Sequence, residues 1–153
     1  MRELKFKMLK CGEPTIQYTH SSLIAEEFKY LRNEIQEHFY VVVLDVGNRI
    51  IGKHLVHKGS QEAVQIYPRD VIRAILLAGG IRVIFVHNHP SGNQLPSDQD
   101  NKITEKLGAA CSLLQIDFLD HIIIGDNYFS YQDSTNLPMK YRTFDWEKRA
   151  MIV

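Results

Sequence analysis

Segment 81–114 constrains the fold of this chain more than any other stretch of its sequence. The apolar run 81–86 predicts a buried strand, and residues 97–114 predict a helix with its apolar side chains on one side. The loop between them is bounded by Pro90 and Pro96. Strand, loop and helix in this order form the repeating unit of an α/β domain, in which functional residues commonly lie at the carboxyl ends of strands.

Metal-binding side chains gather at the junction of this strand and helix. His87 and His89 stand two residues apart at the strand end, so their imidazoles project from one face toward a common point. Asp100 reaches the same point if the proline-bounded loop folds back. Two histidines, one aspartate and an open position suit catalytic zinc. We therefore predict a zinc site with His87, His89 and Asp100 as ligands.

The start of the predicted helix also resembles a capping box. In that arrangement Ser97 caps the helix, and the side chain of Asp100 reaches back to the Ser97 backbone amide. Ser97 can combine capping with another role, whereas we expect Asp100 to serve either as cap or as ligand. The two histidines just upstream favour the ligand.

The remaining sequence alternates between helical and extended patterns. Apolar residues recur at helical spacing from Ser21 or Ser22 to about Glu37, with Ile35 among them and a serine available as the N-cap. A second helix is predicted over Pro68 to Ala78, ended by two glycines. Further strands are predicted over 39–46, 50–57, 118–124 and 128–131.

These elements indicate a single α/β domain with a central mixed sheet flanked by helices. We expect the domain to span 21–132, after an N-terminal extension (1–20) and before a C-terminal tail (133–153). With 153 residues, 44% of them hydrophobic, the chain is long enough for one substantial core and short for two.

Composition argues against several classes of protein. Lysine plus arginine equal aspartate plus glutamate at 18 each, so no overall field draws the chain onto nucleic acid or an anionic membrane. No apolar stretch approaches the ~20 residues that span a bilayer, and no signal peptide is apparent. Cys11 and Cys111 lack a CxxC spacing, which argues against a disulfide framework and favours a reducing cytoplasm.

The sequence resembles the RadC-like branch of the JAMM (MPN+) domain family. The hallmark of that family is His-x-His, seven residues, Ser, two residues and Asp, and His87, His89, Ser97 and Asp100 occupy these positions. Segments 67–70 and 120–125 also resemble the family, so the similarity covers roughly residues 22–132. The resemblance implies a JAB/MPN-like, cytidine-deaminase-like single domain.

The resemblance also implies a chemistry. In JAMM peptidases the histidines and the aspartate hold zinc, the serine stabilises the oxyanion, and an upstream glutamate handles the proton of the attacking water. Carried over, this implies Ser97 as oxyanion donor and Glu37 as base, because Glu37-His38-Phe39 resembles the segment that carries the family's glutamate. The implied activity is zinc-dependent hydrolysis of a peptide or amide bond in an unknown peptide or protein.

Alternatives to this assignment remain open. Glu34 lies one helical turn before Glu37, and His54 is a fallback base or a fourth zinc ligand, which would close the site and make it structural. For His121 we expect a strand-entry histidine hydrogen-bonded to Asp120, with support of a metal ligand as the alternative. The alternative function is a non-catalytic metal-binding module for protein or nucleic acid, in a family historically linked to DNA repair.

Overall fold

A five-stranded mixed sheet forms the centre of the part of the chain that this computed structural model describes, residues 16–59, 66–134, 144–145 and 150–151. The spatial order is β2-β1-β3-β4-β5, and the strands are β1 (Glu37–Leu44), β2 (Ile50–Gly59), β3 (Arg82–Asn88), β4 (Asp117–Ile124) and β5 (Tyr128–Ser130). β3 and β4 run parallel, whereas the other neighbours are antiparallel. The expected α/β architecture with a central mixed sheet is confirmed.

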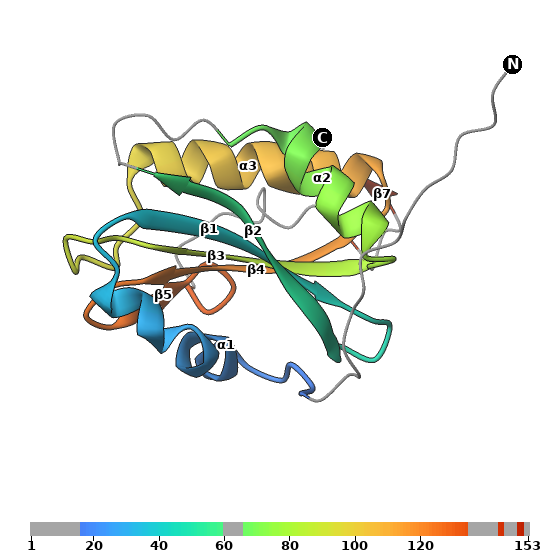
Figure 1. Cartoon of the computed structure of the whole chain (residues 1–153). Helices are drawn as coiled ribbons and strands as arrows, with labels where there is room; N and C mark the ends of the chain where they lie inside the picture. Colours follow the sequence, from blue (N-terminus) through green and yellow to red (C-terminus); the bar gives the residue numbers. More distant parts are fainter. Residues whose placement is uncertain (1–15, 60–65, 135–143, 146–149, 152–153) are drawn as a thin grey trace, which may run out of the picture.

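Helices cover both faces of this sheet (Figure 1). They are α1 (Ser21–Glu27), the 3-10 helix η1 (Lys29–Asn33), α2 (Pro68–Leu77) and α3 (Asp98–Leu113). α2 and α3 lie together on one face, and α1 lies on the other. Two short strands in the predicted tail, β6 (Phe144–Asp145) and β7 (Ala150–Met151), pair with each other.

Alternating side chains of β1 divide the core into two clusters, because successive residues of a strand point to opposite faces. The cluster beneath α2 and α3 includes Phe39, Val41, Val43, Val71, Ile75, Phe85 and Leu107. The cluster beneath α1 includes Ile24, Phe28, Leu31, Val42, Leu44, Ile84 and Val86. Both faces of the central strands are therefore buried, which explains their continuous apolar sequences.

Local turn signals place several boundaries as predicted. Pro68 occupies the first turn of α2, and Gly79 follows the helix with φ of 70°. The β1–β2 hairpin turns at Asn48, which has φ of 60°. β1 ends two residues earlier than predicted, because the carboxylate of Asp45 accepts the backbone N–H groups of Gly47 and Arg49 at 2.8 and 2.9 Å and begins the turn.

The first helix is shorter than predicted, and the prediction that it extends to Glu37 is wrong. The α-helix ends at Glu27. At its other end the predicted serine cap is wrong, because His20 is the N-cap residue and makes no side-chain capping bond. After η1 the backbone becomes extended at Glu34, Ile35 is 90% exposed, and Glu37 opens β1 opposite Gly59.

A buried amide explains this early end. Asn88, fully buried at the end of β3, donates through Nδ2 to the carbonyl of Leu31 at 3.2 Å and to that of Gln36 at 3.1 Å. Its Oδ1 accepts the backbone N–H of His38 at 2.8 Å. These bonds hold the segment before β1 in a path that a continuing helix would not allow.

The proposed extension and tail lie largely outside the described residues, so the boundaries of the domain stay predictions. Cys11 also lies outside them, while Cys111 is a buried free thiol. Among the helices of the described segments, none is long and apolar enough to cross a membrane. The cytoplasmic location stays a prediction.

Candidate metal centre

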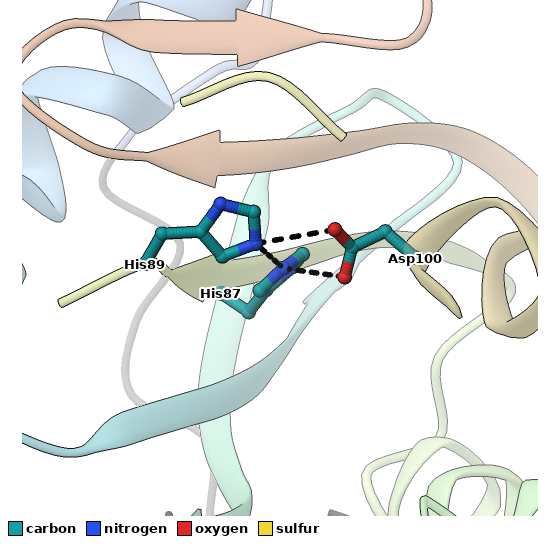
Figure 2. A group of neighbouring side chains, drawn as sticks. All are labelled: His87, His89 and Asp100. Carbon is teal, nitrogen blue, oxygen red and sulfur yellow. Dashed lines mark hydrogen bonds and ion pairs between the residues drawn. The ribbon is translucent and has the colours of Figure 1, made fainter. Parts of the chain in front are cut away.

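Three predicted ligands converge at the carboxyl end of β3 (Figure 2). His87 Nε2 lies 3.0 Å from Asp100 Oδ1, and His89 Nε2 lies 3.2 Å from Asp100 Oδ2. The two Nε2 atoms are 3.0 Å apart. Within the described part of the chain, these residues form a group whose ligand atoms all lie within 4.8 Å of one another.

The loop after β3 brings Asp100 to the histidines. The backbone N–H of His89 donates to the Ile124 carbonyl at 2.9 Å, so the chain stays beside β4 past the end of β3. Gly92, with φ of 85°, then turns the loop, and its carbonyl accepts the Asp126 N–H at 2.7 Å. A Cβ atom on Gly125 would lie 2.4 Å from that carbonyl oxygen, so this close approach requires glycine.

Asp100 belongs to the capping box of α3 and also lies in the cluster with the two histidines. The α3 capping box is complete: the Ser97 hydroxyl accepts the Asp100 N–H at 3.1 Å, and Asp100 Oδ2 accepts the Ser97 N–H at 2.7 Å. Asp100 Oδ1 faces His87 at the same time. The geometry therefore allows one residue to cap α3 and to face the histidines, because a carboxylate has two oxygens with several acceptor sites. The ligand role of Asp100 stays a prediction.

Hydrogen bonding also orients His89. Its Nδ1 lies 2.7 Å from the Asn93 carbonyl oxygen, which can only accept, so Nδ1 carries the hydrogen. In the neutral ring, Nε2 then presents a lone pair toward Asp100. A backbone carbonyl bonded to the far nitrogen is a frequent support for histidine ligands of metals.

The charges in the cluster favour a cation. Burial raises the pKa of Asp100, but His87 and His89, which donate to it when their Nε2 atoms are protonated, outweigh burial and hold that pKa well below its ordinary value. Burial lowers the pKa of His89, but its contact with Asp100 outweighs this effect, and the pKa rises above 6.5. The cluster therefore attracts positive charge, either a proton or a metal ion.

The donor set fits a divalent metal. Two imidazole nitrogens and one carboxylate approach one another from three sides, which is the ligand type of catalytic zinc sites with a free position. A divalent cation would also balance the charge of the carboxylate.

Of the other predicted residues, some line the cleft that leads to the cluster and others do not. Glu37 and Ser97 line a cleft of about 570 Å³ together with the three clustered residues. Glu37 is half-buried there, and its charge contributes to the raised pKa of His89. Glu34 is not among the lining residues and lies 3.9 Å from His38 Nε2.

His54 is neither a fourth member of the cluster nor part of the cleft. It is exposed on β2, opposite Val41, whereas His57 lines the cleft. The fallback roles of His54 as ligand or base are therefore wrong. A bulge between the partners of Phe39 and Tyr40 shifts the register of β2 just before His57.

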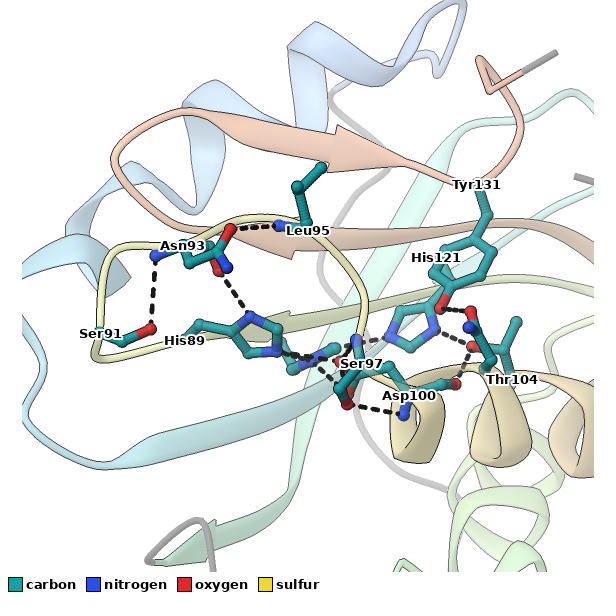
Figure 3. A network of polar contacts seen from close by, with 11 residues as sticks. His89, Ser91, Asn93, Leu95, Ser97, Asp100, Thr104, His121 and Tyr131 are labelled. Atoms are coloured by element: carbon teal, nitrogen blue, oxygen red, sulfur yellow. Dashed lines mark hydrogen bonds and ion pairs between the residues drawn. The ribbon is translucent and has the colours of Figure 1, made fainter. Parts of the chain in front are cut away.

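His121 is the residue whose surroundings the sequence did not indicate. Its backbone N–H donates to Asp120 Oδ1 at 2.7 Å, but its ring points the other way and lies 2.8 Å from His87 Nδ1 through Nε2. Thr104 Oγ1 contacts its Nδ1 at 2.6 Å (Figure 3). Burial lowers the pKa of His121 well below its ordinary value. The expected hydrogen bond with Asp120 is therefore made by the backbone of His121 and not by its ring. The position of the ring depends on the pairing of β3 with β4, which no local sequence pattern indicates.

Comparison with known proteins agrees with the α/β architecture of the domain. The RadC-like JAB domain family matches residues 16–137. A UPF0758 protein of Actinobacillus pleuropneumoniae serotype 5b (strain L20) is 41% identical over 104 residues, which cover 67% of this chain and 47% of that protein. UPF0758 proteins of Methanosarcina acetivorans and Haemophilus ducreyi are 45% identical over 104 residues and 36% identical over 133 residues. These matches cover 67% and 86% of this chain, and 45% and 58% of those proteins.

The mixed sheet with helices on both faces, together with this family match, defines a JAB/MPN-type domain. The chain belongs to the RadC-like JAB domain family, and the resemblance seen in its sequence is confirmed. It spans about half the length of the curated relatives that it matches.

Proposed function

We propose that this protein is a zinc-dependent hydrolase of a peptide or amide bond. His87, His89 and Asp100 are the zinc ligands, Glu37 is the base, and Ser97 is the oxyanion donor. The observation that carries the proposal is that the three clustered ligands and both of these side chains line one cleft. When bound, zinc supplies Lewis acidity that polarises a carbonyl group and activates water at neutral pH.

Glu37 has the position and the exposure for proton transfer. It stands at the first residue of β1, half-buried in the cleft, and is near enough to His89 to raise its pKa. A carboxylate there accepts a proton from the attacking water and returns it to the leaving nitrogen. Asn88 forms hydrogen bonds with the backbone of the residues before and after Glu37, so the backbone that carries this carboxylate is held in place.

Ser97 has a hydroxyl that can turn toward a substrate. This hydroxyl donates to Asp100 Oδ2 at 2.7 Å. The same oxygen also accepts the backbone N–H of Ser97, so it keeps a partner when the hydroxyl turns away. The hydroxyl then donates to the developing oxyanion, a contact that stabilises the transition state.

The cleft also supports a peptide as substrate. Its walls combine apolar and basic side chains: Phe39, Ile66, Leu95, Pro96, Ile103, Lys102 and Lys106. Apolar walls with few polar groups are typical of sites that bury part of a ligand. The substrate is therefore a peptide segment with an apolar side chain near the cleaved bond.

The test is cleavage of a peptide library by zinc-loaded protein, followed by mass spectrometry. Glu37→Gln removes the base while keeping its size, and His54→Ala is the matched control outside the cleft. At equal zinc loading we expect cleavage by wild type and by His54→Ala, and a loss of at least about 100-fold in Glu37→Gln. Zinc-loaded wild type that cleaves no member of the library, or undiminished turnover in Glu37→Gln, contradicts the proposal.

A further inference from the structure

A chain of three hydrogen bonds leads from the metal centre into the core (Figure 3). His87 Nδ1 lies 2.8 Å from His121 Nε2, and His121 Nδ1 lies 2.6 Å from Thr104 Oγ1. Thr104 Oγ1 in turn donates to the Asp100 carbonyl at 2.6 Å. The chain thus starts at one residue of the cluster and ends on the backbone of another, crossing β3, β4 and α3.

The hydrogen bond between Thr104 and the Asp100 carbonyl determines which atom donates in each of the three hydrogen bonds. A carbonyl oxygen can only accept, so the single hydroxyl hydrogen of Thr104 is committed to Asp100. The hydroxyl oxygen then accepts from His121, which places the ring hydrogen of His121 on Nδ1. In a neutral imidazole, the other nitrogen, Nε2, is left as an acceptor.

The same logic continues to the metal centre. Because His121 Nε2 accepts, His87 donates through Nδ1. In the neutral ring of His87 the remaining nitrogen, Nε2, then carries a lone pair, and this atom lies 3.0 Å from Asp100 Oδ1. His87 is thereby set in the tautomer that a metal ion requires at Nε2.

Packing keeps the His121 ring from leaving this arrangement. The ring is fully buried, and Tyr131 stacks on it at 5.2 Å between ring centroids with an interplanar angle of 9°. Phe39 and Phe85 contact it edge-on at 5.6 and 6.2 Å. The Tyr131 hydroxyl donates to Asn101 on α3 at 2.8 Å, which ties this cover to the helix that carries Asp100.

We propose that Thr104 and His121 are positioning residues that set the tautomer of His87 for binding a divalent metal ion. This inference rests on the metal site of the proposed function but not on hydrolysis. Without the Thr104 hydroxyl, a hydrogen on His121 Nδ1 has no acceptor, and the ring gains by carrying it on Nε2 instead. That hydrogen faces His87 Nδ1, which must then accept, so the hydrogen of His87 moves to Nε2 and blocks the metal position.

Two substitutions of Thr104 separate the hydroxyl from the shape of the side chain. Thr104→Val keeps the shape and removes the hydroxyl, whereas Thr104→Ser keeps the hydroxyl and removes a methyl group. The affinity for Zn²⁺ is measured by competition with a chromophoric chelator. We expect Thr104→Val to bind zinc about 10- to 100-fold more weakly, the usual loss when a partner of a ligand is removed. Thr104→Ser binds like wild type.

A second measurement reads the tautomers directly. Nitrogen-15 NMR of the histidine rings in metal-free protein at alkaline pH, where the rings are neutral, reports which nitrogen carries the hydrogen. We expect Nδ1–H for His87 and His121 in wild type and Thr104→Ser, and a shift toward Nε2–H in Thr104→Val. Thermal unfolding verifies that each variant is folded.

Several outcomes overturn the inference. An Nε2–H tautomer of His87 in the wild type does so, as does wild-type zinc affinity in Thr104→Val. Equal weakening in the valine and serine variants assigns the effect to packing and also refutes the role of the hydroxyl. Absence of zinc binding by wild type instead contradicts the proposed function, and the tautomers of the metal-free protein still test the direction of the chain.

Discussion

The backbone N–H of His38 donates to the side chain of Asn88 at 2.8 Å, which links β1, the strand of the proposed base, to β3, the strand that carries His87. Asn88 stands between His87 and His89, and its amide points to the opposite face of β3. Three consecutive residues, the last two of β3 and the one that follows, therefore serve both parts of the cleft. The outer two meet Asp100, and the middle one holds the backbone around Glu37.

The buried amide of Asn88 makes Asn88→Asp destabilising. The carboxylate loses both Nδ2 hydrogen bonds and faces the carbonyl oxygens of Leu31 and Gln36. We expect the free energy of unfolding to fall by about 2–4 kcal/mol, measured by urea denaturation in chelator. Asn93→Asp is the control, because the exposed Asn93 side chain accepts the Leu95 N–H through its oxygen, and a carboxylate keeps that acceptor. A similar loss in both variants would contradict the role of the buried amide.

Ser97→Ala and Asp100→Asn separate capping from metal binding. Alanine at position 97 removes the capping hydroxyl, so we expect about 1 kcal/mol lower stability with zinc still bound in equimolar amount. Asparagine at 100 keeps an acceptor for the Ser97 N–H but lacks the charge, so stability changes less and zinc affinity falls sharply. Urea denaturation and elemental analysis measure the two effects. Tight zinc binding by Asp100→Asn would remove this residue from the proposed ligands.

Loss of one imidazole should abolish equimolar zinc binding. In His89→Ala two proposed ligands remain, and we expect affinity to fall by more than the roughly 100-fold that follows loss of a supporting residue. The matched control is His57→Ala, because His57 lines the same cleft without joining the cluster. Chelator competition measures both variants. Retention of zinc by His89→Ala, or an equal loss in His57→Ala, would refute the assignment.

Asp120 should make stability depend on pH. Burial raises its pKa from 3.8 to about 6, although Ser130 and two backbone N–H groups donate to it. The folded protein therefore binds the proton more tightly than the unfolded chain. This stabilisation is fully present below the unfolded pKa of 3.8 and is lost as pH rises through about 6.

The corresponding measurement compares wild type with Asp120→Asn in chelator. Between about pH 4 and 7 we expect wild type to lose about 3 kcal/mol of unfolding free energy relative to the variant, from the shift of about two pKa units. The asparagine keeps an oxygen for the two backbone N–H groups, so the variant is expected to fold. Parallel curves of stability against pH would exclude Asp120 as the titrating group.

Local signals allowed much of this fold to be predicted from the sequence. Pro68 begins α2 and Ser97 caps α3, and each acts on backbone within four residues of itself. The end of the first helix was not predictable in this way, because it depends on Asn88, which lies 57 residues after its hydrogen-bond partner Leu31 in the sequence. His121 was misjudged for the same reason, since its ring meets His87 only through the pairing of β3 with β4.

The docking of the ligand loop on the β4–β5 turn has a consequence for engineering. Transfer of the segment from His87 to Asp100 into another scaffold would carry over the three metal-binding side chains. It would leave out the carbonyl of Ile124 and the glycine at 125, which this loop contacts. It would also leave behind the imidazole on the neighbouring strand that orients the first donor. A transplant that keeps these contacts therefore needs at least the stretch from Arg82 to Tyr131.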